Sequence, residues 1–300
     1  MSTNRSGRRR GARRTAVAGA ALGLGAALLA AGTATGSPGS ATSADPAAAD
    51  PPTATVVFHD DFDGPAGAPV DGSSWNLDPG DNINNVERQY YTDGTDNVAQ
   101  DGNGNLVITA EEGNPGNHQC YYGPCEYTSG RINTAGKIEA EHGRVEARIQ
   151  LPEGQGVWPA FWMLGTDFGD VGWPQSGEID IMELLGHEMD TVHGTVHGPG
   201  YSGGGGIGSA YQLPDGGSFG DGFHTFAIDW SPESITWSVD GDEYQTLTPA
   251  DVTGEWVFDK PFFLILNVAV GGEWPGYPDE STQFPQEMVV DHVTVTEFTG

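Results

Sequence analysis

The chain has 300 residues, with 12 Lys or Arg against 42 Asp or Glu and a formal net charge of −30 at pH 7. Six of the basic residues lie in the first 14 positions, which leaves six against all 42 acids, a formal charge of −36, for the rest of the chain. Such a surface repels phosphate backbones and anionic lipids, so it disfavours nucleic-acid and membrane partners. It suits a neutral substrate.

The start of the chain predicts a secretory signal over residues 1–36. A basic segment is followed by an apolar run from Ala16 to Ala31 and by a zone of small residues, which is the order of an export signal. The run is rich in Ala and Gly, so a membrane anchor is the weaker interpretation. An Arg pair suggests twin-arginine export, although a dipeptide in an Arg-rich region carries little weight. We therefore expect a secreted, extracellular protein without a membrane segment.

Two further parts follow the predicted signal. Residues 37–53 are rich in Pro, Ala, Ser and Thr and contain no aromatic side chain, so they predict a linker. Residues 54–300 have the length of one large domain. Their sequence shows no internal repeat.

Nearly all of this domain's secondary-structure signal is of strand type. Short runs of β-branched and aromatic residues are separated by Gly, Pro, Asn or Asp. Helical periodicity is missing, and 46 Gly with 20 Pro argue against a helical protein. Many short strands without alternating helices predict an all-β sandwich or jelly roll. The predicted strands lie at residues 53–62, 105–112, 143–151, 225–231, 235–241, 262–270 and 288–298.

The segment GEIDIMELLG, residues 177–186, carries three acids among apolar side chains. Side chains of a strand alternate between its two faces, so Glu178 and Asp180 share a face and Glu183 points the other way. A buried strand with a few solvated acids is the ordinary interpretation, but three carboxylates in an apolar strand repel one another unless they line a polar cleft. One extra residue at Ile181-Met182 would form a β-bulge and return Glu183 to the face of the other two, and bulges are enriched near active sites.

Three acids on one face suit the hydrolysis of glycosides. One carboxylate attacks the anomeric carbon, and a second protonates the leaving oxygen. A separation of about 5–5.5 Å between these carboxyl groups gives retention of configuration, and a wider gap that admits water gives inversion. The middle acid, Asp180, would hold the nucleophile by a hydrogen bond and help to keep the acid protonated.

The sequence resembles the laminarinase-like branch of glycoside hydrolase family 16, whose signature Glu-x-Asp-x-x-Glu stands here as Glu178, Asp180 and Glu183. The resemblance extends over about residues 55 to 299 and does not depend on one motif. The matching segments are ERQYYT (87–92), YTSGRINT (127–134), GRVEARIQLPEGQGVWPAFWMLG (143–165), HGTVHGPGYSGGGGIG (193–208), FHTFAIDWSPESITWSVDG (223–241) and ILNVAVGGEWPG (265–276).

The resemblance implies a concanavalin-like β-jelly-roll sandwich of two curved antiparallel sheets with a concave substrate cleft. It implies retaining endo-hydrolysis of β-1,3-glucan without a catalytic cofactor, with Glu178 as nucleophile, Asp180 as its assisting acid and Glu183 as general acid/base. The spacing before the second Glu also marks this branch, because the lichenase branch has one residue fewer there.

Exposed tryptophans are the next candidates, because an aromatic ring packs well on the C–H face of a pyranose. A given Trp is nevertheless more often part of a core. Trp173, five residues before Glu178, is the first candidate for stacking near the cleavage point, a role that the resemblance supports. Trp158 and Trp274 follow.

Alternation along the segment 157–165 sends Trp158 and Trp162 to one face and Phe161 to the other. Trp230 and Trp237 are expected in the sandwich core.

Four polar residues are further candidates for the cleft: Asn85, Glu87, Arg131 and Asn267. Arg131 and Asn267 have strand-rich surroundings, where long polar groups serve either a ligand or a structural network, and both interpretations remain for each. The segment NNVERQYY departs from the family's commoner NNELQYY by one inserted residue, which weakens the transfer of roles to Asn85 and Glu87.

Two patterns match known motifs formally, a zinc-binding histidine pair and a dinucleotide-binding glycine motif, but the surrounding sequence disfavours both interpretations. His193 and His197 have the i,i+4 spacing of a helical zinc site, but Gly and β-branched neighbours argue against a helix, and HExxH is absent from the sequence. Both would share one face of a strand, and the resemblance favours His197 as a residue that binds sugar or touches the acid/base. GGGGIG, residues 203–208, matches G-x-G-x-x-G formally but has no βαβ context, so we interpret it as a flexible loop beside the cleft.

Cys120 and Cys125 are the two cysteines of the chain. A disulfide is the default in a secreted protein, and a metal site needs more ligands than C-x4-C offers. The resemblance also implies a structural calcium ion, held by Asp291 and the carbonyls of Asp61 and Gly104.

Three functions compete at this point. The first is a secreted, monomeric endo-β-1,3-glucanase with β-1,3-glucan as its partner. The second is another polysaccharidase on the same scaffold, acting on mixed-linkage glucan, agar or carrageenan, although the acidic charge disfavours sulfated polymers. The third is a non-catalytic β-glucan-binding lectin, but such relatives would typically lack one or more of the acids that this chain retains.

Overall fold

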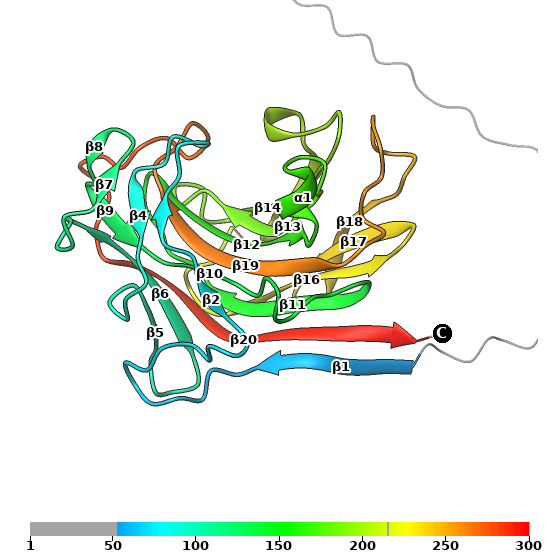
Figure 1. The fold of residues 1–300 in the computed structure, drawn as a ribbon, viewed down its shortest axis with the longest axis horizontal. Helices are drawn as coiled ribbons and strands as arrows, with labels where there is room; N and C mark the ends of the chain where they lie inside the picture. The colour runs from blue at the N-terminus through cyan, green and yellow to red at the C-terminus, as the bar shows by residue number, and fades with distance from the viewer. Residues whose placement is uncertain (1–52, 215, 300) are drawn as a thin grey trace, which may run out of the picture. The chain divides into compact units, whose positions relative to one another are not determined.

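The structure, a computed structural model, describes residues 53–214 and 216–299. The predicted signal (1–36) and nearly all of the predicted linker (37–53) lie outside these residues. Among the described residues no helix has the length and apolar character needed to cross a membrane. The described part of the domain consists of strands in two layered sheets (Figure 1), which confirms the all-β sandwich prediction.

The larger sheet has 11 strands, nine of which follow the order β18-β17-β16-β11-β20-β6-β9-β4-β3, while β1 pairs with β20 and β5 with β6. Among the described strands of this sheet every pairing is antiparallel except the short one of β4 with β9, which is parallel. The strands are β1 (Thr53–Asp60), β3 (Gly80–Asp81), β4 (Gln89–Tyr91), β5 (Val98–Gln100), β6 (Leu106–Glu112), β9 (Tyr127–Ser129), β11 (Gly143–Gln150), β16 (His224–Ser231), β17 (Ser234–Val239), β18 (Asp242–Leu247) and β20 (Gln286–Thr299).

The smaller sheet has seven strands in the order β15-β14-β13-β12-β19-β10-β2. Figure 1 shows its curved strands above β11 and β20, between loops near β4 on one side and loops near α1 on the other. This sheet carries the segments that the sequence marked as a candidate site. Its strands are β2 (Asn76–Leu77), β10 (Arg131–Asn133), β12 (Val157–Gly165), β13 (Glu178–Leu184), β14 (Thr191–His197), β15 (Ile207–Gln212) and β19 (Phe262–Val270).

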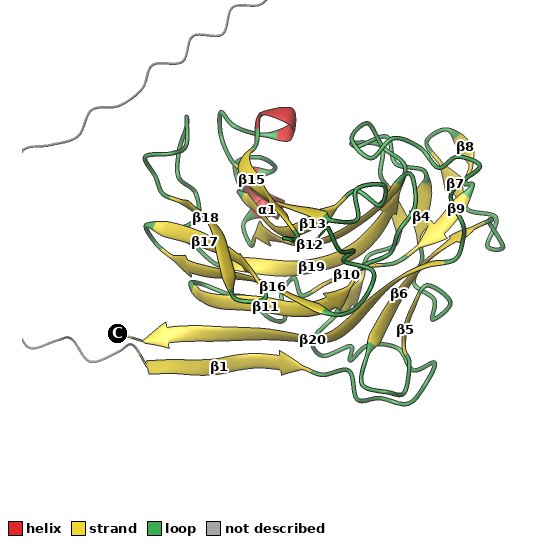
Figure 2. Ribbon diagram, turned by 180° about the vertical axis from the view of Figure 1, so that it is seen from behind, coloured by secondary structure: helices red, strands yellow, loops and turns green. Residues whose placement is uncertain are grey.

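The remaining elements are short. Strands β7 (Gln119–Cys120) and β8 (Gly123–Pro124) form a hairpin, and a disulfide joins Cys120 to Cys125, as predicted. The helical elements of the described chain are α1 (Phe168–Val171) and the 3-10 helix η1 (Gly203–Gly205). Figure 2 shows how small this helical share is beside the strands and loops.

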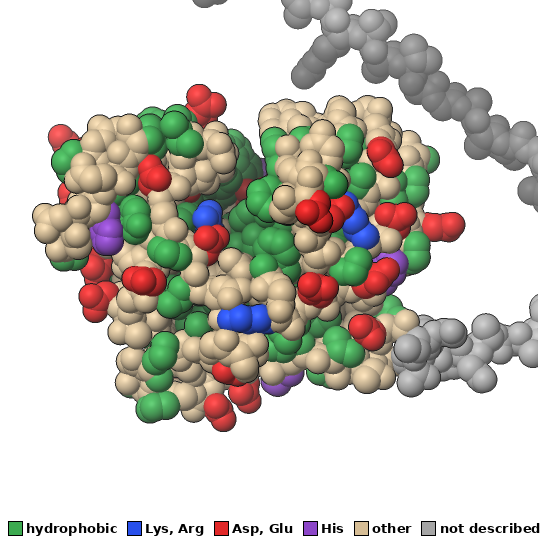
Figure 3. Space-filling view, in the orientation of Figure 1, with side chains coloured by type: hydrophobic (Ala, Val, Ile, Leu, Met, Phe, Trp, Pro, Cys, Tyr) green, Lys and Arg blue, Asp and Glu red, His purple; other side chains and the backbone are tan. Residues whose placement is uncertain are grey.

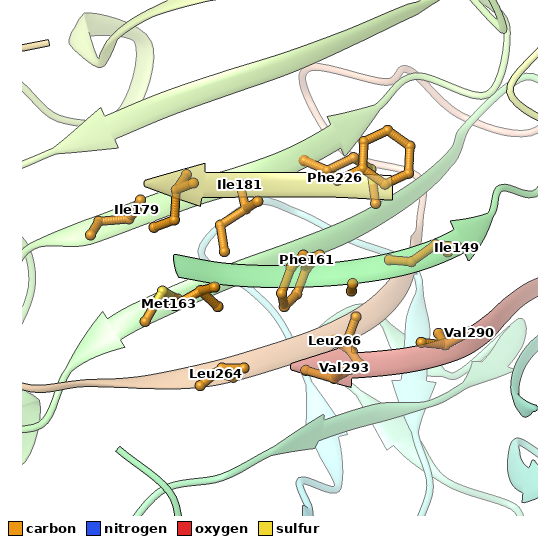
Figure 4. Close-up of a cluster of buried hydrophobic side chains, with 14 of the residues drawn as sticks. Ile149, Phe161, Met163, Ile179, Ile181, Phe226, Leu264, Leu266, Val290 and Val293 are labelled. Carbon is orange, nitrogen blue, oxygen red and sulfur yellow. The ribbon is translucent and has the colours of Figure 1, made fainter. Parts of the chain in front are cut away.

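Apolar side chains from both sheets fill the space between the layers. Strands β6 and β11 alternate buried and less buried positions, as sheets with one face on a core do. Figure 4 shows Phe161 and Ile179 of the smaller sheet in one cluster with Ile149 and Val293 of the larger one, and each of these side chains is 0% exposed. Burying one such side chain stabilises the fold by about 1.5–3 kcal/mol. The packed core therefore gives the seven-stranded sheet a rigid base.

Candidate active site

A register shift in β13 turns its three acids to one face. Pairing with β14 matches the acids to every second residue of that strand, with an irregularity between Asp180 and Glu183. The pairs are Glu178 with His197, Asp180 with Thr195 and Glu183 with His193. The pairing of β13 with β12 shifts at the same place. The bulge predicted at Ile181-Met182 is therefore confirmed, and Glu183 shares the face of the other acids.

The bulge also keeps the apolar side chains of β13 in the core. Ile181 and Met182 are only 3% and 0% exposed, and Figure 4 shows Ile181 among the core side chains. A regular strand cannot turn two adjacent residues inward. One inserted residue thus satisfies both requirements of the segment, an apolar face for the core and a face with three acids.

His197 lies beside two of the acids. Its Nε2 atom is 3.1 Å from Oδ2 of Asp180 and 3.6 Å from Oε1 of Glu178. Within residues 53–214 and 216–299 these three side chains form the one group of three or more His, Cys, Asp or Glu whose ligand atoms all lie within 4.8 Å of one another. His193 is not a member of this group.

Burial raises the pKa of all three carboxyl groups. It raises the pKa of Asp180 to about 8 and holds the pKa of Glu178 and that of Glu183 well above their usual range. The charge of Asp180 raises the pKa of both glutamates further, whereas His197 lowers it. Since three like charges in a small buried space repel strongly, the cluster retains protons at neutral pH.

Two tryptophans and a histidine surround Glu183. The indole N–H of Trp158 donates a hydrogen bond to Oε1 of Glu183, at 3.1 Å. The Trp274 ring meets Trp158 edge to face at 5.5 Å and lies 5.0 Å from the ring of His193. Trp274 is 44% exposed and open to a ligand. Trp158 is less exposed and acts on the Glu183 carboxyl itself, a contact that the stacking prediction missed.

Trp173 lies at the other end of the row of acids. It is 43% exposed, and its ring centroid is 6.0 Å from that of His197. The Trp173 indole favours the charged form of the Glu178 carboxyl and lowers its pKa, against the larger effect of burial. Trp173, the first candidate for sugar stacking, therefore lies next to Glu178.

Figure 3 shows a recess between the two groups of loops, with hydrophobic side chains exposed inside it. Beside His193 a further hollow of about 210 Å³ extends over β14 and β15. Its lining residues are His193, Thr195, Gly206, Gly208, Ser209 and Ala210.

The glycine-rich segment contributes to this hollow, but it is only in part a loop. It consists of η1 followed by the start of β15. A Cβ atom at Gly206 would lie 2.4 Å from Cε1 of His197. Glycine at this position therefore leaves room for the histidine beside the acids.

Arg131 and Asn267 lie on the same face as the acids. Register pairs Arg131 with Asn267, Asn267 with Ala160, and Ala160 with Glu183, so these four residues form one row across four strands. Trp162 is also on this face, opposite Asp180, while Phe161 is buried, as the alternation predicted.

The two candidates on the loop before β4 behave differently. Asn85 is exposed, and its backbone carbonyl accepts the N–H of Glu273, next to Trp274, at 3.4 Å. Glu87 is 3% exposed and hydrogen-bonded to Asn82, Asn85, Gln89 and Tyr91. Glu87 therefore belongs to a structural network. The sequence carried no signal for this burial, since loop acids are ordinarily solvated.

The residues predicted for calcium fit only in part. Gly104 lies against Asp61, because a Cβ atom there would be 3.7 Å from the Asp61 carbonyl oxygen. Asp291 lies at a register irregularity of β20, and its Oδ2 atom forms an ion pair with Arg148. A guanidinium bound at that oxygen competes with a cation, so the calcium site stays a prediction.

A curved β-sheet with clustered acids and exposed tryptophans defines a carbohydrate-active class of protein. The sequence profile described as "Glycosyl hydrolases family 16" matches residues 85–293. The chain belongs to this family.

Individual relatives agree with this membership. The chain is 41% identical over 252 residues to a Beta-glucanase of Rhodothermus marinus, an overlap of 80% of this chain and 84% of that protein. It is 36% identical over 276 residues to Glucan endo-1,3-beta-glucosidase A1 of Niallia circulans, an overlap of 85% of this chain but only 39% of the other. The solved laminarinase catalytic domain of Thermotoga maritima MSB8 superposes with a TM-score of 0.76 at 48% identity, covering 82% of this chain and 99% of that one.

Proposed function

We propose that the protein is a secreted, retaining endo-β-1,3-glucanase that cleaves internal linkages by double displacement. The observation that carries this proposal is the bulge in β13, which brings Glu178, Asp180 and Glu183 to one face of the smaller sheet. Two carboxyl groups with unequal surroundings are what the two steps of glycoside hydrolysis require.

In the first step Glu178 attacks the anomeric carbon while Glu183 donates its proton to the leaving glycosidic oxygen. The C–O bond to the leaving sugar breaks, and an ester bond to Glu178 forms. In the second step Glu183, now a carboxylate, takes a proton from water, and that water displaces Glu178 with net retention. Burial, which raises the pKa of Glu183, keeps the proton available at neutral pH.

Asp180 and His197 maintain the unequal protonation of the two glutamates. With a pKa of about 8, Asp180 is protonated at pH 7 and can donate its proton to the Glu178 carboxylate as a hydrogen bond. A protonated Asp180 also removes the repulsion that raises the pKa of Glu178. His197 lowers the pKa of both glutamates, but its Nε2 atom is in contact with Glu178 alone of the two, at 3.6 Å, so Glu178 is ionised when Glu183 is not.

Sugar rings are expected on Trp173 at the Glu178 end and on Trp274 at the Glu183 end of the acid row. Each stands more than 40% exposed, and an exposed indole offers a sugar a large apolar face. Asn85, Arg131 and Asn267 supply hydrogen bonds to hydroxyl groups.

Laminarin is the expected substrate because relatives carry the names endo-1,3-beta-glucosidase and laminarinase. The test is the release of reducing sugar from laminarin, mixed-linkage β-glucan and agarose by the purified protein. Fastest release from laminarin, with a ladder of short oligosaccharides at early times, is the expected result. Faster release from mixed-linkage glucan would favour the alternative glucanase, and binding without release would favour a lectin.

Secretion, the monomeric state and calcium belong to the same proposal. The chain should appear in the culture medium without residues 1–36, and it should elute from a sizing column as a monomer. A calcium ion at Asp291, Asp61 and Gly104 would be structural, since a proton-transfer mechanism needs no metal. Chelation should then lower the melting temperature of the wild type and leave that of Asp291→Asn unchanged.

A further inference from the structure

A buried carboxylate outside the acid row collects four hydrogen-bond donors. Oε1 of Glu87 accepts from the side-chain amides of Asn82 at 2.8 Å and Asn85 at 3.0 Å. Oε2 accepts from the amide of Gln89 at 2.6 Å and from the hydroxyl of Tyr91 at 3.2 Å. Glu87 is 3% exposed, so these donors take the place of water around it. A carboxylate with four partners is fully engaged and does not itself bind sugar.

Tyr91 connects this hydrogen-bond network to residues on the face of the sheet that carries the acids. Its hydroxyl accepts a hydrogen bond from the side-chain amide of Asn267 at 3.2 Å. Oδ1 of Asn267 in turn accepts the indole N–H of Trp162 at 2.7 Å. The guanidinium carbon of Arg131 lies 4.7 Å from the centroid of the Tyr91 ring, at the distance of a cation–π contact. Arg131 and Asn267 are therefore connected to Glu87 through one tyrosine.

The loop that carries Asn85 and Glu87 is held in an unfavourable conformation. Val86, between them, has φ of 52°, a left-handed conformation that is a genuine outlier for a β-branched residue. Such strain persists only where the surroundings over-determine the backbone. Here the bonds to Glu87 supply that constraint, together with Gln89, whose Oε1 accepts the backbone N–H of Val270 at 2.7 Å.

We propose that Glu87 is a positioning residue that fixes Asn85, Arg131 and Asn267 in the orientation that binds glucan, an inference that rests on the proposed glucanase function. A carboxylate accepts but does not donate, so it directs the Nδ2 atom of Asn85 inward and leaves the Oδ1 atom to accept from a sugar hydroxyl. Fixing three polar side chains before the substrate arrives removes an entropic cost of binding.

The test is the kinetics of Glu87→Gln on laminarin. This nearly isosteric change replaces one acceptor oxygen by a donor amide, which faces donors on every side. KM should rise about tenfold while kcat stays within about twofold, the pattern of lost ground-state binding. Tyr91→Phe keeps the ring beneath Arg131 and removes the link to Asn267, so its KM should rise about threefold.

Glu126→Gln is the matched control. Glu126 forms an exposed ion pair with Arg88, the residue next to Glu87, at 2.7 Å. Its substitution should leave KM unchanged.

A double-mutant cycle separates positioning from a purely structural role. If Glu87 acts through Asn85, the effect of Glu87→Gln on KM should shrink in an Asn85→Ala background. An unchanged KM in Glu87→Gln, or fully additive effects in the cycle, would overturn the positioning role. If the wild type still hydrolyses laminarin in that case, the proposed glucanase function stands. If Glu87→Gln does not fold, Tyr91→Phe decides, and an unchanged KM there overturns the proposal. A wild type without turnover would overturn both.

Discussion

The indole N–H of Trp237 donates a hydrogen bond to the backbone carbonyl of Asp180, at 2.8 Å. Trp237 comes from β17 of the larger sheet and is 0% exposed, so this bond crosses the core and ends at the bulge of β13. A bulge disrupts the local ladder, and a buried carbonyl there needs another donor. Gly194 leaves room for the ring, since a Cβ atom at that position would lie 2.5 Å from Cδ1 of Trp237.

Replacing this tryptophan should weaken both the fold and the catalytic geometry. Trp237→Phe removes this hydrogen bond to the buried Asp180 carbonyl, which costs about 1–3 kcal/mol and lowers the melting temperature by about 2–4 °C for each kcal/mol. We also expect kcat to fall about tenfold, because a small displacement of the acids misaligns the attack. Thermal unfolding and laminarin kinetics measure the two effects.

Trp230→Phe is the matched control for this prediction. Trp230 is 2% exposed, and its N–H bonds to the carbonyl of Phe258 at 2.8 Å, away from the bulge. It should lose comparable stability and keep its kcat. Equal losses of kcat in the two variants would show that the bond to the bulge has no special role.

The two glutamates should respond differently to the leaving group. Glu183→Gln removes the general acid, so hydrolysis of laminarin should fall about 10²–10⁴-fold, while an aryl glycoside with a good leaving group should still react to form the enzyme ester. Glu178→Gln removes the nucleophile, so both substrates should be affected. Burst kinetics with a dinitrophenyl laminaribioside distinguish the cases, and a burst in Glu178→Gln would contradict the assignment.

Asp180→Asn should shift the alkaline limb of the pH profile of kcat/KM to lower pH. On the alkaline side of the Asp180 pKa of about 8, the carboxylate charge of Asp180 raises the pKa of Glu183, so removing that charge lowers the pKa of Glu183. The acid must be protonated to work, and the alkaline limb of kcat/KM therefore shifts to lower pH. The acids titrate together, so the limb reports the cluster rather than one residue. A limb that stays in place or moves upward would refute the coupling.

The sequence predicted much of the site because the acids conflict with strand alternation. In the segment 177–186 the apolar side chains can face the core while all three acids face a cleft only if the strand contains one extra residue. The structure has that bulge. The contact between Trp237 and the Asp180 carbonyl was not predictable, since a side-chain bond to a distant backbone atom leaves no local pattern. The burial of Glu87 was missed for the same reason: its partners become neighbours through the loop before β4 and the Tyr91 side chain.

Trp158→Phe should move the alkaline limb in the opposite direction. The Trp158 hydrogen bond favours the charged form of Glu183 and so lowers the pKa of that carboxyl. Without the bond the pKa of Glu183 rises, and the limb of kcat/KM moves to higher pH. Trp162→Phe is the control, because its N–H bonds to Asn267 instead of an acid. An equal upward shift in both variants would mean that the bond to Glu183 is not the cause.

The most direct test of the central claim is to trap the glycosyl-enzyme ester. Incubation with a 2-deoxy-2-fluoro laminaribiosyl fluoride, peptic digestion and mass spectrometry identify the residue that carries the sugar. A carbohydrate adduct on Glu178 is the predicted result, because the bulge directs that carboxylate and Glu183 to the same sugar. An adduct on Glu183, or turnover of the reagent to an inverted product without any adduct, would contradict it.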